Sequence, residues 1–420
     1  MFSGRRKMFE IGKDVLIAAL IVSALLLARQ TGLFGSGGSD GSILQSHDVP
    51  TENGSVAAAA IPYYIAAVPE SGGRYGLTHG EERVTEMYNR FSAILGEALG
   101  SSGQPEQVEE ARWREALTKP GVYFDYLYPQ SLSVLSGWLG TEISGSAAAH
   151  AARRICLALE EDSLMLYYIR ADNGEFCRCE TALSASMLSS RMEEYMPNGA
   201  QFCFELTEDA AIDAYALMED GIQSFNSLSG TNPLRDAGAA ERLTDLFGFS
   251  GSVRSYSETD GIVYVEGDAT LRVSSSGTVT YRCQEGGVEL GGASASVQTV
   301  VEEARKFCIS GPGSVCGAAR LGLSGLRFEQ AGNTCVLTFE YASNGVPVRL
   351  TDGAAVELTV QNGTLREAVV HYRSYSAEAE TVSPLPQTLA LAAVRAVGGG
   401  EPLLTYVDTR KEVTLQWIAA

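Results

Sequence analysis

TCVLTFEYASNGVPVRLTDGAAVELTVQNGTLREAVVHYRSY, residues 334–375, is the stretch that decides the fold class. It contains two Asn-Gly pairs, at 344–345 and 362–363, and each pair lies between runs in which apolar and polar residues alternate. Asn-Gly is the preferred pair for a two-residue hairpin turn, because both positions tolerate positive φ angles. The pattern therefore predicts an antiparallel sheet in this part of the chain.

Helices are predicted on either side of this sheet. One covers SVQTVVEEARKFC (296–308) and another 386–397, and a last hairpin follows at 404–407 and 413–418. Upstream, AAERLTDLFG (239–248) reads as a helix that precedes a meander. The predicted strands of that meander are 252–256, 261–266, 268–274 and 278–283. A helix followed by a meander thus occurs twice, and this order predicts a duplicated α+β module.

The first α+β domain is predicted over residues 61–230. An amphipathic helix is expected over 81–99, and a buried, aromatic-rich strand over 121–128 (GVYFDYLY). Asp172-Asn173-Gly174 reads as the turn of a hairpin. Three further segments are predicted: a helix or helix-to-strand passage at 147–152, a helix over 182–196 and a strand over 201–206.

The N-terminal segment contains the apolar run VLIAALIVSALLLA, residues 15–28, which follows Arg5, Arg6, Lys7 and Lys13. Extended to residue 34, this run is long enough for a helix to cross a bilayer. The basic flank predicts a cytoplasmic N-terminus and an extracytoplasmic location for the rest of the chain. A cleaved signal peptide has the same charge pattern and is the alternative.

The fold class expected is therefore α+β, with an N-terminal transmembrane helix followed by exported domains of antiparallel sheets packed with helices. The predicted parts are a cytoplasmic flank (1–14), the anchor (15–34), a glycine-rich flexible linker (35–60), an N-terminal α+β domain (61–230), a central helix-plus-meander unit (236–285) and a C-terminal α+β module (294–420).

Charge excludes some classes of partner. The 420 residues carry a formal net charge of −20, are 45% hydrophobic and include few lysines. Such a chain can build large cores, but it repels polyanions, so nucleic acid is not expected as a ligand.

The eight cysteines match no zinc-binding spacing. Cys156, Cys203, Cys308 and Cys335 lie among apolar neighbours, as small core residues do, so mostly buried thiols are expected. A disulfide between Cys308 and Cys316 is the alternative left open.

No catalytic motif emerges from the sequence. The four histidines form no metal-binding pattern, and no nucleophile elbow or phosphate-binding loop is present. We therefore expect no catalytic residue, no metal and no cofactor. A pair of carboxylates like that of a glycosidase stays open, because 51 acidic residues give no positional signal.

Several segments resemble the YycH/YycI family of two-component-system regulatory proteins. They are KDVLIAALIVSALLLARQTG (13–32), GVYFDYLYPQSLSVLSGWLG (121–140), LTDLFGFSGSVRSYSETDGIVYVEGDATLRVSSSGTVTYRC (243–283), residues 339–375 and LLTYVDTRKEVTLQWIAA (403–420). The resemblance implies a membrane-anchored extracytoplasmic regulator without catalytic residues. It implies as partner a membrane sensor histidine kinase of the WalK/YycG type, with a second member of the same family as a further partner.

The expected function is regulation of that kinase through protein–protein contacts. Ala19 and Ser23, four residues apart in the apolar run, offer small side chains for close approach of a partner helix. Two alternatives stay open: a PepSY-like exported module that restrains a peptidase or binds envelope components, and a cell-wall hydrolase.

Overall fold

The computed structural model describes residues 56–219, 223–235, 238–329 and 333–420. The predicted anchor, with Ala19 and Ser23, and most of the predicted linker lie outside these ranges. None of the helices inside them combines the length and the apolar composition needed to span a bilayer.

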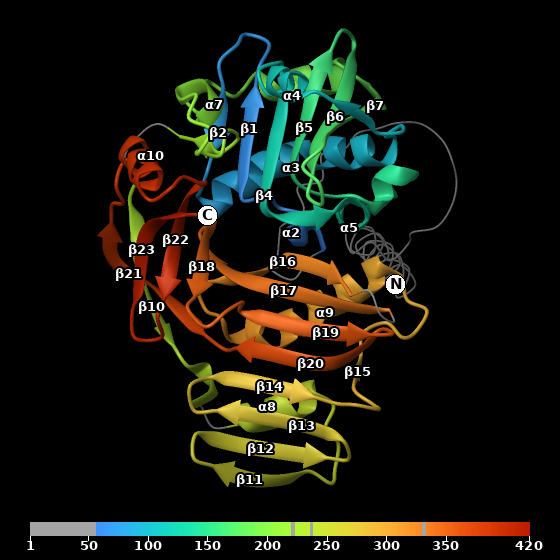
Figure 1. Cartoon of the computed structure of the whole chain (residues 1–420), viewed down its shortest axis with the longest axis vertical. Helices are drawn as coiled ribbons and strands as arrows, with labels where there is room; N and C mark the ends of the chain where they lie inside the picture. The colour runs from blue at the N-terminus through green and yellow to red at the C-terminus, as the bar shows by residue number, and fades with distance from the viewer. Residues whose placement is uncertain (1–55, 220–222, 236–237, 330–332) are drawn as a thin grey trace, which may run out of the picture. The chain divides into compact units, whose positions relative to one another are not determined.

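The first half of the described chain forms one antiparallel sheet, the N-terminal sheet, with strand order β2-β1-β4-β5-β6-β7-β3 (Figure 1). Its strands are β1 (Tyr64–Val68), β2 (Tyr75–Leu77), β3 (Glu106–Val108), β4 (Gly121–Ser131), β5 (Ala151–Glu160), β6 (Ser163–Arg170) and β7 (Phe176–Ser184). The hairpin predicted at Asp172-Asn173-Gly174 is confirmed as the β6–β7 connection. In β4, burial is continuous from Gly121 to Leu127, which explains the aromatic run in its sequence.

Helices cover both faces of the N-terminal sheet. The predicted amphipathic helix is confirmed as α3 (Glu81–Gly100), whose Tyr88 packs edge-on against Phe124 of β4. On the other face, α4 (Glu110–Ala116) inserts Trp113 into a cluster with Tyr123 and Tyr167. Because side chains alternate along β4, Tyr123 and Phe124 belong to these two different cores.

A second sheet, the C-terminal sheet, follows in the described residues, and its main path is β11-β12-β13-β14-β20-β19-β17-β18-β22-β23. The strands are β11 (Arg254–Glu258), β12 (Gly261–Glu266), β13 (Ala269–Ser274), β14 (Thr278–Arg282), β15 (Val288–Glu289), β16 (Arg320–Phe328), β17 (Thr334–Ser343), β18 (Val346–Leu350), β19 (Val356–Gln361), β20 (Thr364–His371), β22 (Pro402–Asp408) and β23 (Val413–Ala419). Both predicted Asn-Gly turns are confirmed, since Asn344 and Asn362 have φ angles of 50°. The last hairpin is confirmed as β22–β23.

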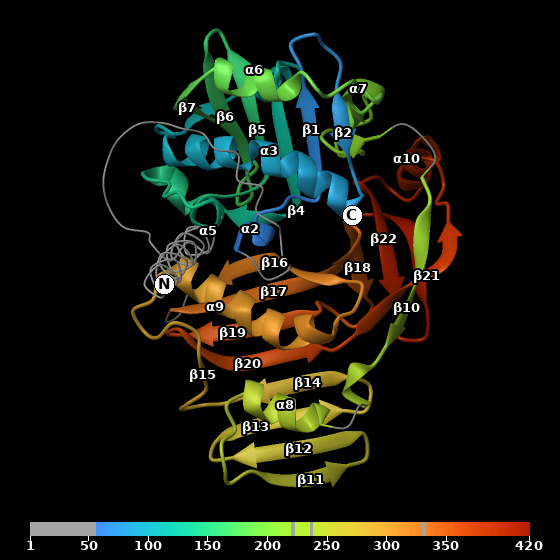
Figure 2. The ribbon, with the colours of Figure 1, turned by 180° about the vertical axis from the view of Figure 1, so that it is seen from behind.

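Two helices lie on the same face of the C-terminal sheet (Figure 2). Helix α8 (Ala239–Leu246) precedes β11–β14, and α9 (Val297–Ser310) precedes β16, β17, β19 and β20. Each of these sets of strands is an antiparallel meander, and their last strands, β14 and β20, pair antiparallel. The helix-then-meander order expected from the sequence is therefore present twice, and the fold class is α+β with antiparallel sheets.

The chain also forms contacts outside these meanders. Strand β10 (Phe225–Thr231) pairs with β21 (Ser374–Val382), and β18 pairs in parallel with β22. Helix α10 (Gln387–Ala396) packs beside the β22–β23 hairpin (Figure 1). The predicted limits of the units 61–230, 236–285 and 294–420 stay predictions. The β10–β21 and β14–β20 pairs nevertheless join strands from different predicted units.

Two of the predicted elements are wrong in part. The helix predicted over 182–196 is limited to α6 (Ser186–Met192), because β7 extends to Ser184. The strand predicted over 201–206 is β8 (Gln201–Phe202) followed by helix α7 (Cys203–Leu206). The Glu205 carboxylate accepts the N–H of Phe202 at 2.7 Å and so closes the first turn of α7, which alternation of residue types cannot reveal.

At 147–152, a short 3₁₀ turn (Ser146–Ala149) leads into β5, so the helix-to-strand alternative is the correct one. The cysteine prediction is confirmed: all eight thiols are free and buried. The alternative bridge between Cys308 and Cys316 is therefore wrong.

Candidate functional site

Two features lie between the N-terminal sheet and the C-terminal part of the chain. One is a buried ion network centred on Asp125 of β4. The other is a groove between helices α2 (Val56–Ala59), α3 and α5 (Leu132–Trp138) on one side and α9 with β16 on the other. We consider them in turn, because one is closed and the other open.

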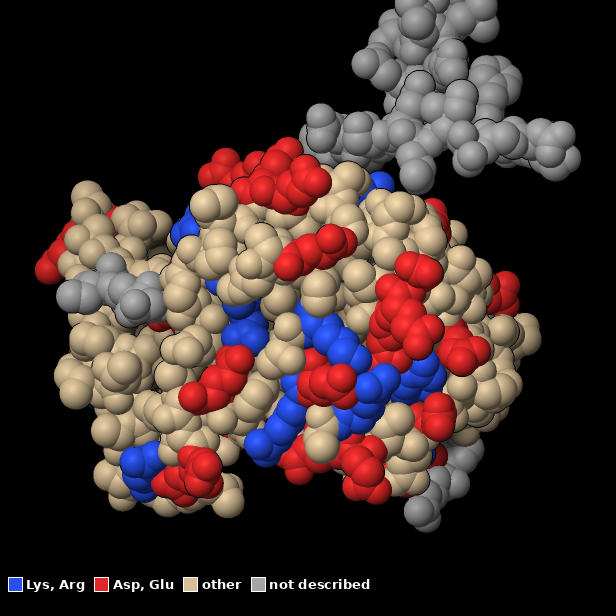
Figure 3. All heavy atoms as spheres, turned by 90° about the horizontal axis from the view of Figure 1, so that it is seen from above, with Lys and Arg blue, Asp and Glu red and all other residues tan. Residues whose placement is uncertain are grey.

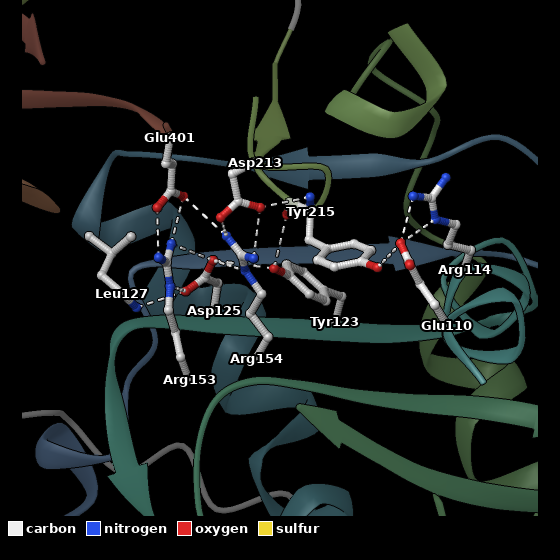
Figure 4. Close-up of polar contacts among 10 residues, drawn as sticks. All are labelled: Glu110, Arg114, Tyr123, Asp125, Leu127, Arg153, Arg154, Asp213, Tyr215 and Glu401. Carbon is white, nitrogen blue, oxygen red and sulfur yellow. Dashed lines mark hydrogen bonds and ion pairs between the residues drawn. The ribbon is translucent and has the colours of Figure 1, made fainter. Parts of the chain in front are cut away.

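Asp125 is completely buried and binds two consecutive arginines (Figure 4). Arg153 donates to both of its carboxylate oxygens, at 2.7 and 2.9 Å, and Arg154 donates from Nε at 3.2 Å. The N–H of Leu127 adds a hydrogen bond of 2.8 Å. The carboxylate is thus fully satisfied by hydrogen bonds.

Local irregularity brings both arginines to the same carboxylate. Neighbouring residues of a regular strand point to opposite faces of the sheet. The β5–β6 register shifts between Ala152 and Ile155, and β4 shifts against β5 after Asp125, where Leu127 has a φ angle of 59°. Bulges of this kind redirect side chains, and here they gather charge in the interior.

Glu401 and Asp213 complete the network from other parts of the chain. Arg153 donates to both oxygens of Glu401, each at 2.6 Å, and Arg154 to both oxygens of Asp213, each at 2.9 Å. Glu401 immediately precedes β22, so the network ties the N-terminal sheet to the C-terminal part of the chain (Figure 4). A fork-to-fork geometry of this kind fixes orientation as well as distance.

The Asp125 carboxylate at the centre of this network stays ionised. Burial alone raises the pKa of Asp125, but the charges of Arg153 and Arg154 outweigh it and leave that pKa below its usual value. A carboxylate held ionised in this way is unsuited to proton transfer at neutral pH. We therefore assign the network a structural role.

A chain of polar contacts continues from the network towards the surface. Tyr123 donates to Asp125 at 3.2 Å and to the carbonyl of Tyr215 at 3.3 Å, and the Tyr215 hydroxyl donates to Glu110 at 2.6 Å. That hydrogen bond, together with Arg114, lowers the pKa of Glu110 (Figure 4).

The basic side chains at the end of the N-terminal sheet are also paired. Figure 3 shows Lys and Arg gathered on this face directly against Asp and Glu. Glu160 contacts Arg112 at 2.6 Å, Lys119 at 3.4 Å and Arg178 at 3.1 Å. Burial raises the pKa of Glu160, yet the Tyr167 hydroxyl and these cations lower it to about 2. The cations are neutralised locally, so this face is not a polyanion-binding surface.

The groove is the open feature, with a volume of about 590 Å³. Its walls combine small, apolar and charged side chains. They include Ala58, Ala59, Ile61, Glu81, Glu82, Thr85, Trp138, Arg305, Ile309, Ser314, Arg320, Leu321 and Leu323. Arg320 Nε bridges the two walls by an ion pair of 2.7 Å with Glu81. The mixture of apolar wall and few charges is typical of a site that binds a ligand or a peptide.

Strand β16 forms one wall of the groove and pairs in the sheet with β17. Its register shifts between Leu323 and Gly325, and the Leu323 carbonyl accepts a hydrogen bond of 3.2 Å from Gln130. β16 is thus bonded to β4 at Leu323, and Leu323 lines the groove together with Arg320 and Leu321.

Next to Gly322, which lines the groove, two polar groups have no hydrogen-bond partner in the described structure. Glu340 is opposite Gly322 in the β16–β17 register, and its Oε2 atom is buried without a hydrogen-bond partner in the described structure, as is the Tyr63 hydroxyl. Burial raises the pKa of Glu340 to about 7, although the Ala355 N–H and Arg349 oppose this rise. Glu340 is therefore the carboxyl near the groove that can titrate close to neutral pH.

Among the described residues, no reactive constellation faces the groove. Cys316 lines it, but its thiol donates to the carbonyls of Gly313 and Ala319, and burial raises its pKa to about 11. A thiol with that pKa is a poor nucleophile at neutral pH. Across the described ranges, no group of three or more His, Cys, Asp or Glu side chains could hold a metal ion.

The sequence prediction of the functional site concerned Ala19 and Ser23 alone, and both lie outside the described residues. The ion network and the groove were missed. The adjacent pair Arg153-Arg154 in an otherwise apolar strand was the available signal, because charges in a buried strand need partners.

No protein-family model, no curated protein and no solved structure matches the chain.

Proposed function

We propose that the protein is a membrane-anchored extracytoplasmic regulator that modulates a cell-envelope sensor histidine kinase by protein–protein contacts, without catalysis of its own. Residues 15–34 would serve as the anchor and the chain after residue 34 as the exported part. The resemblance of five segments to the YycH/YycI family supports this proposal.

The repeated helix-plus-meander arrangement also supports it. The family resemblance at 243–283 and at 339–375 falls on the strands that follow α8 and α9. Two such modules joined through β14 and β20 are what duplication of one unit would produce. We therefore interpret the C-terminal sheet as a duplicated module.

The position of the groove is the observation that carries the mechanism. Ala58 and Ala59 of α2 line the groove, and α2 is the first described element and lies at the C-terminal end of the predicted linker. A segment bound in the groove would touch the chain where it leads towards the anchor. We propose that an exported segment of the kinase docks here, and that docking is coupled to helix pairing at Ala19 and Ser23.

The ion network gives this coupling a rigid base. Arg153 and Arg154 connect β5 to Asp213 and Glu401, so the two sides of the molecule cannot separate without exposing buried charge. Because the two sheets are held together, binding at the groove would then act on the linker and would not be absorbed by motion of one sheet relative to the other.

The test of the proposed function is the double substitution Ala19→Leu and Ser23→Leu in the full-length protein. It keeps the segment apolar, so membrane abundance should be unchanged, but it fills the face offered for close approach. The matched control is Ile21→Leu with Leu25→Ile, on the opposite face of the predicted helix. Kinase-dependent transcription should change for the first pair and not for the second. Equal output from both pairs would contradict the proposal.

A further inference from the structure

The edge strand β11 carries an inference that is independent of the proposed function. β11 has the sequence RSYSE, residues 254–258, and pairs in the sheet with β12 (Figure 1). Arg254, Ser255, Tyr256 and Ser257 are exposed, and Tyr256 is 52% exposed. The side of β11 away from β12 thus presents unpaired backbone groups and a large aromatic side chain to solvent.

This short edge strand carries two charges of opposite sign, Arg254 and Glu258, but lacks three other features that protect many sheet edges. Natural edge strands carry lysine, proline or a bulge that prevents pairing with another chain. β11 contains no Lys and no Pro, and its register with β12 is regular over all five residues. By contrast, β16 is bulged at Leu323/Gly325 and bonded to Gln130 of β4.

Contacts at both ends of β11 also fix the conformation of this strand. Just before β11, the backbone N–H groups of Ser250, Gly251 and Ser252 donate to the Glu266 carboxylate at 2.9–3.1 Å. At its other end, Glu258 pairs with Arg272 at 2.7 Å. The strand is therefore ready to pair without further ordering.

The charged residues of β11 indicate that a second copy of the same strand is a complementary partner. In an antiparallel pair of two β11 strands centred on Tyr256, Arg254 of each copy faces Glu258 of the other. Ser255 faces Ser257, and the two tyrosines face each other. The sequence RSYSE is thus complementary to itself, and Arg254 has no ion-pair partner within the described part of its own chain.

The hydrogen bonds agree with the same register. The two-residue loop at 259–260 makes Glu258 and Gly261 a hydrogen-bonded pair, so Tyr256 and Arg254 also direct their backbone groups to β12. Ser255 and Ser257 therefore direct theirs to the free edge. In the pair of copies, these two residues would exchange four hydrogen bonds. Tyr256 and the Arg254–Glu258 pairs would occupy the non-hydrogen-bonded positions, where side chains are closest.

We propose that the protein self-associates through β11, in an antiparallel strand pair with β11 of a second copy that is centred on Tyr256. The C-terminal sheets of the two copies then form one continuous sheet. The interface is one short strand wide, so association is weak and depends on concentration.

Cysteine cross-linking of the full chain tests the register. All native cysteines are buried, so a new surface thiol is the reactive one. In the proposed pair, Tyr256→Cys places two thiols on residues whose Cα atoms are about 4.5 Å apart, within reach of a disulfide. The matched control Ser255→Cys places them about 8 Å apart, out of reach. Under mild oxidation, Tyr256→Cys should give covalent dimers and Ser255→Cys should not. Equal cross-linking of both variants, or none, would overturn the proposal.

Charge reversal tests the pairing without cysteine. Arg254→Glu and Glu258→Arg each place like charges opposite each other, so each variant alone should lose self-association in sedimentation experiments. A mixture of the two variants restores both opposite-charge pairs and should regain it. Failure of the mixture to associate, or self-association of either variant at the wild-type level, would exclude this interface. Unchanged thermal unfolding of each variant confirms that the fold is intact.

Discussion

The two features between the sheets differ in how completely their polar groups are satisfied. At the ion network, two arginines and a backbone N–H surround Asp125. Glu401 and Asp213 neutralise the remaining positive charge of these arginines. Next to Gly322 of the groove, Glu340 Oε2 and the Tyr63 hydroxyl are buried without partners in the described structure. The first feature holds the molecule together, whereas the second lies beside buried polar groups that are not satisfied. The proposed binding site is thus separate from the network that stabilises the fold.

The largest expected effect comes from removing the centre of the network. Asp125→Ala leaves Arg153 and Arg154 buried without their shared carboxylate, and breaking a buried pair from one side costs about 3–5 kcal/mol. We expect the free energy of unfolding from urea titration to fall by that amount. Arg114→Ala, at an exposed pair with Glu110, is the control and should cost less than about 1 kcal/mol. A similar small loss for both variants would show that the network does not hold the molecule together.

The second effect concerns pH. The pKa of Glu340 is about 7 in the folded protein and near 4.5 when unfolded, so the native state binds the extra proton between these values. The contribution of Glu340 to the stability of the wild-type protein therefore falls as the pH rises from about 4.5 to about 7. Above that pH the Glu340→Gln variant, which cannot ionise, should be more stable than wild type, by on the order of 3 kcal/mol.

The measurement is thermal unfolding of wild type and Glu340→Gln at several pH values. The two curves of stability against pH should coincide below about pH 4.5 and diverge up to about pH 7. Parallel curves over the whole range would mean that the Glu340 carboxyl is solvated and does not lack partners.

A smaller effect on stability, but a large one on regulation, is expected from filling the groove. Thr85 lines it from α3, whereas Ala93 lies on the exposed side of the same helix. Thr85→Trp and Ala93→Trp should each change stability by no more than about 1 kcal/mol. Kinase-dependent transcription should be altered by Thr85→Trp alone. The same output from both variants would remove the groove from the mechanism.

The smallest effect is expected at the cysteines. Burial raises the pKa of Cys156 and of Cys203 to about 12, so neither thiol is ionised at neutral pH. Native protein treated with an alkylating reagent should keep its mass, and unfolded protein should take up eight groups. Alkylation of folded protein would show that these cores open, and fewer than eight additions after unfolding would indicate disulfides.

Local signals explain what the sequence predicts. The Asn-Gly turns, the period of α3 and the two helix-then-meander segments all depend on residues a few positions apart, and the structure confirms them. The α7 error arose where a single side chain, Glu205, decides between strand and helix.

The ion network has no such local signal. Asp125 and Arg153 are 28 positions apart, and Arg153 and Glu401 are 248 apart. Alternation also places Arg153 and Arg154 on opposite faces of β5, and the irregularity that brings them together depends on pairing with neighbouring strands. The groove depends on how α2, α3 and β16 approach one another, which no short segment encodes.

The central claim is that regulation acts through the anchor next to the membrane. Replacing residues 1–34 by a cleavable signal sequence, with the rest of the chain unchanged, tests it most directly. A tethered partner has a far higher effective concentration than a diffusing one. Kinase-dependent transcription in cells that export the released form should therefore lose most of its regulation, while the full-length protein restores it. Full regulation by the released form would contradict the account and favour a diffusible exported binding module.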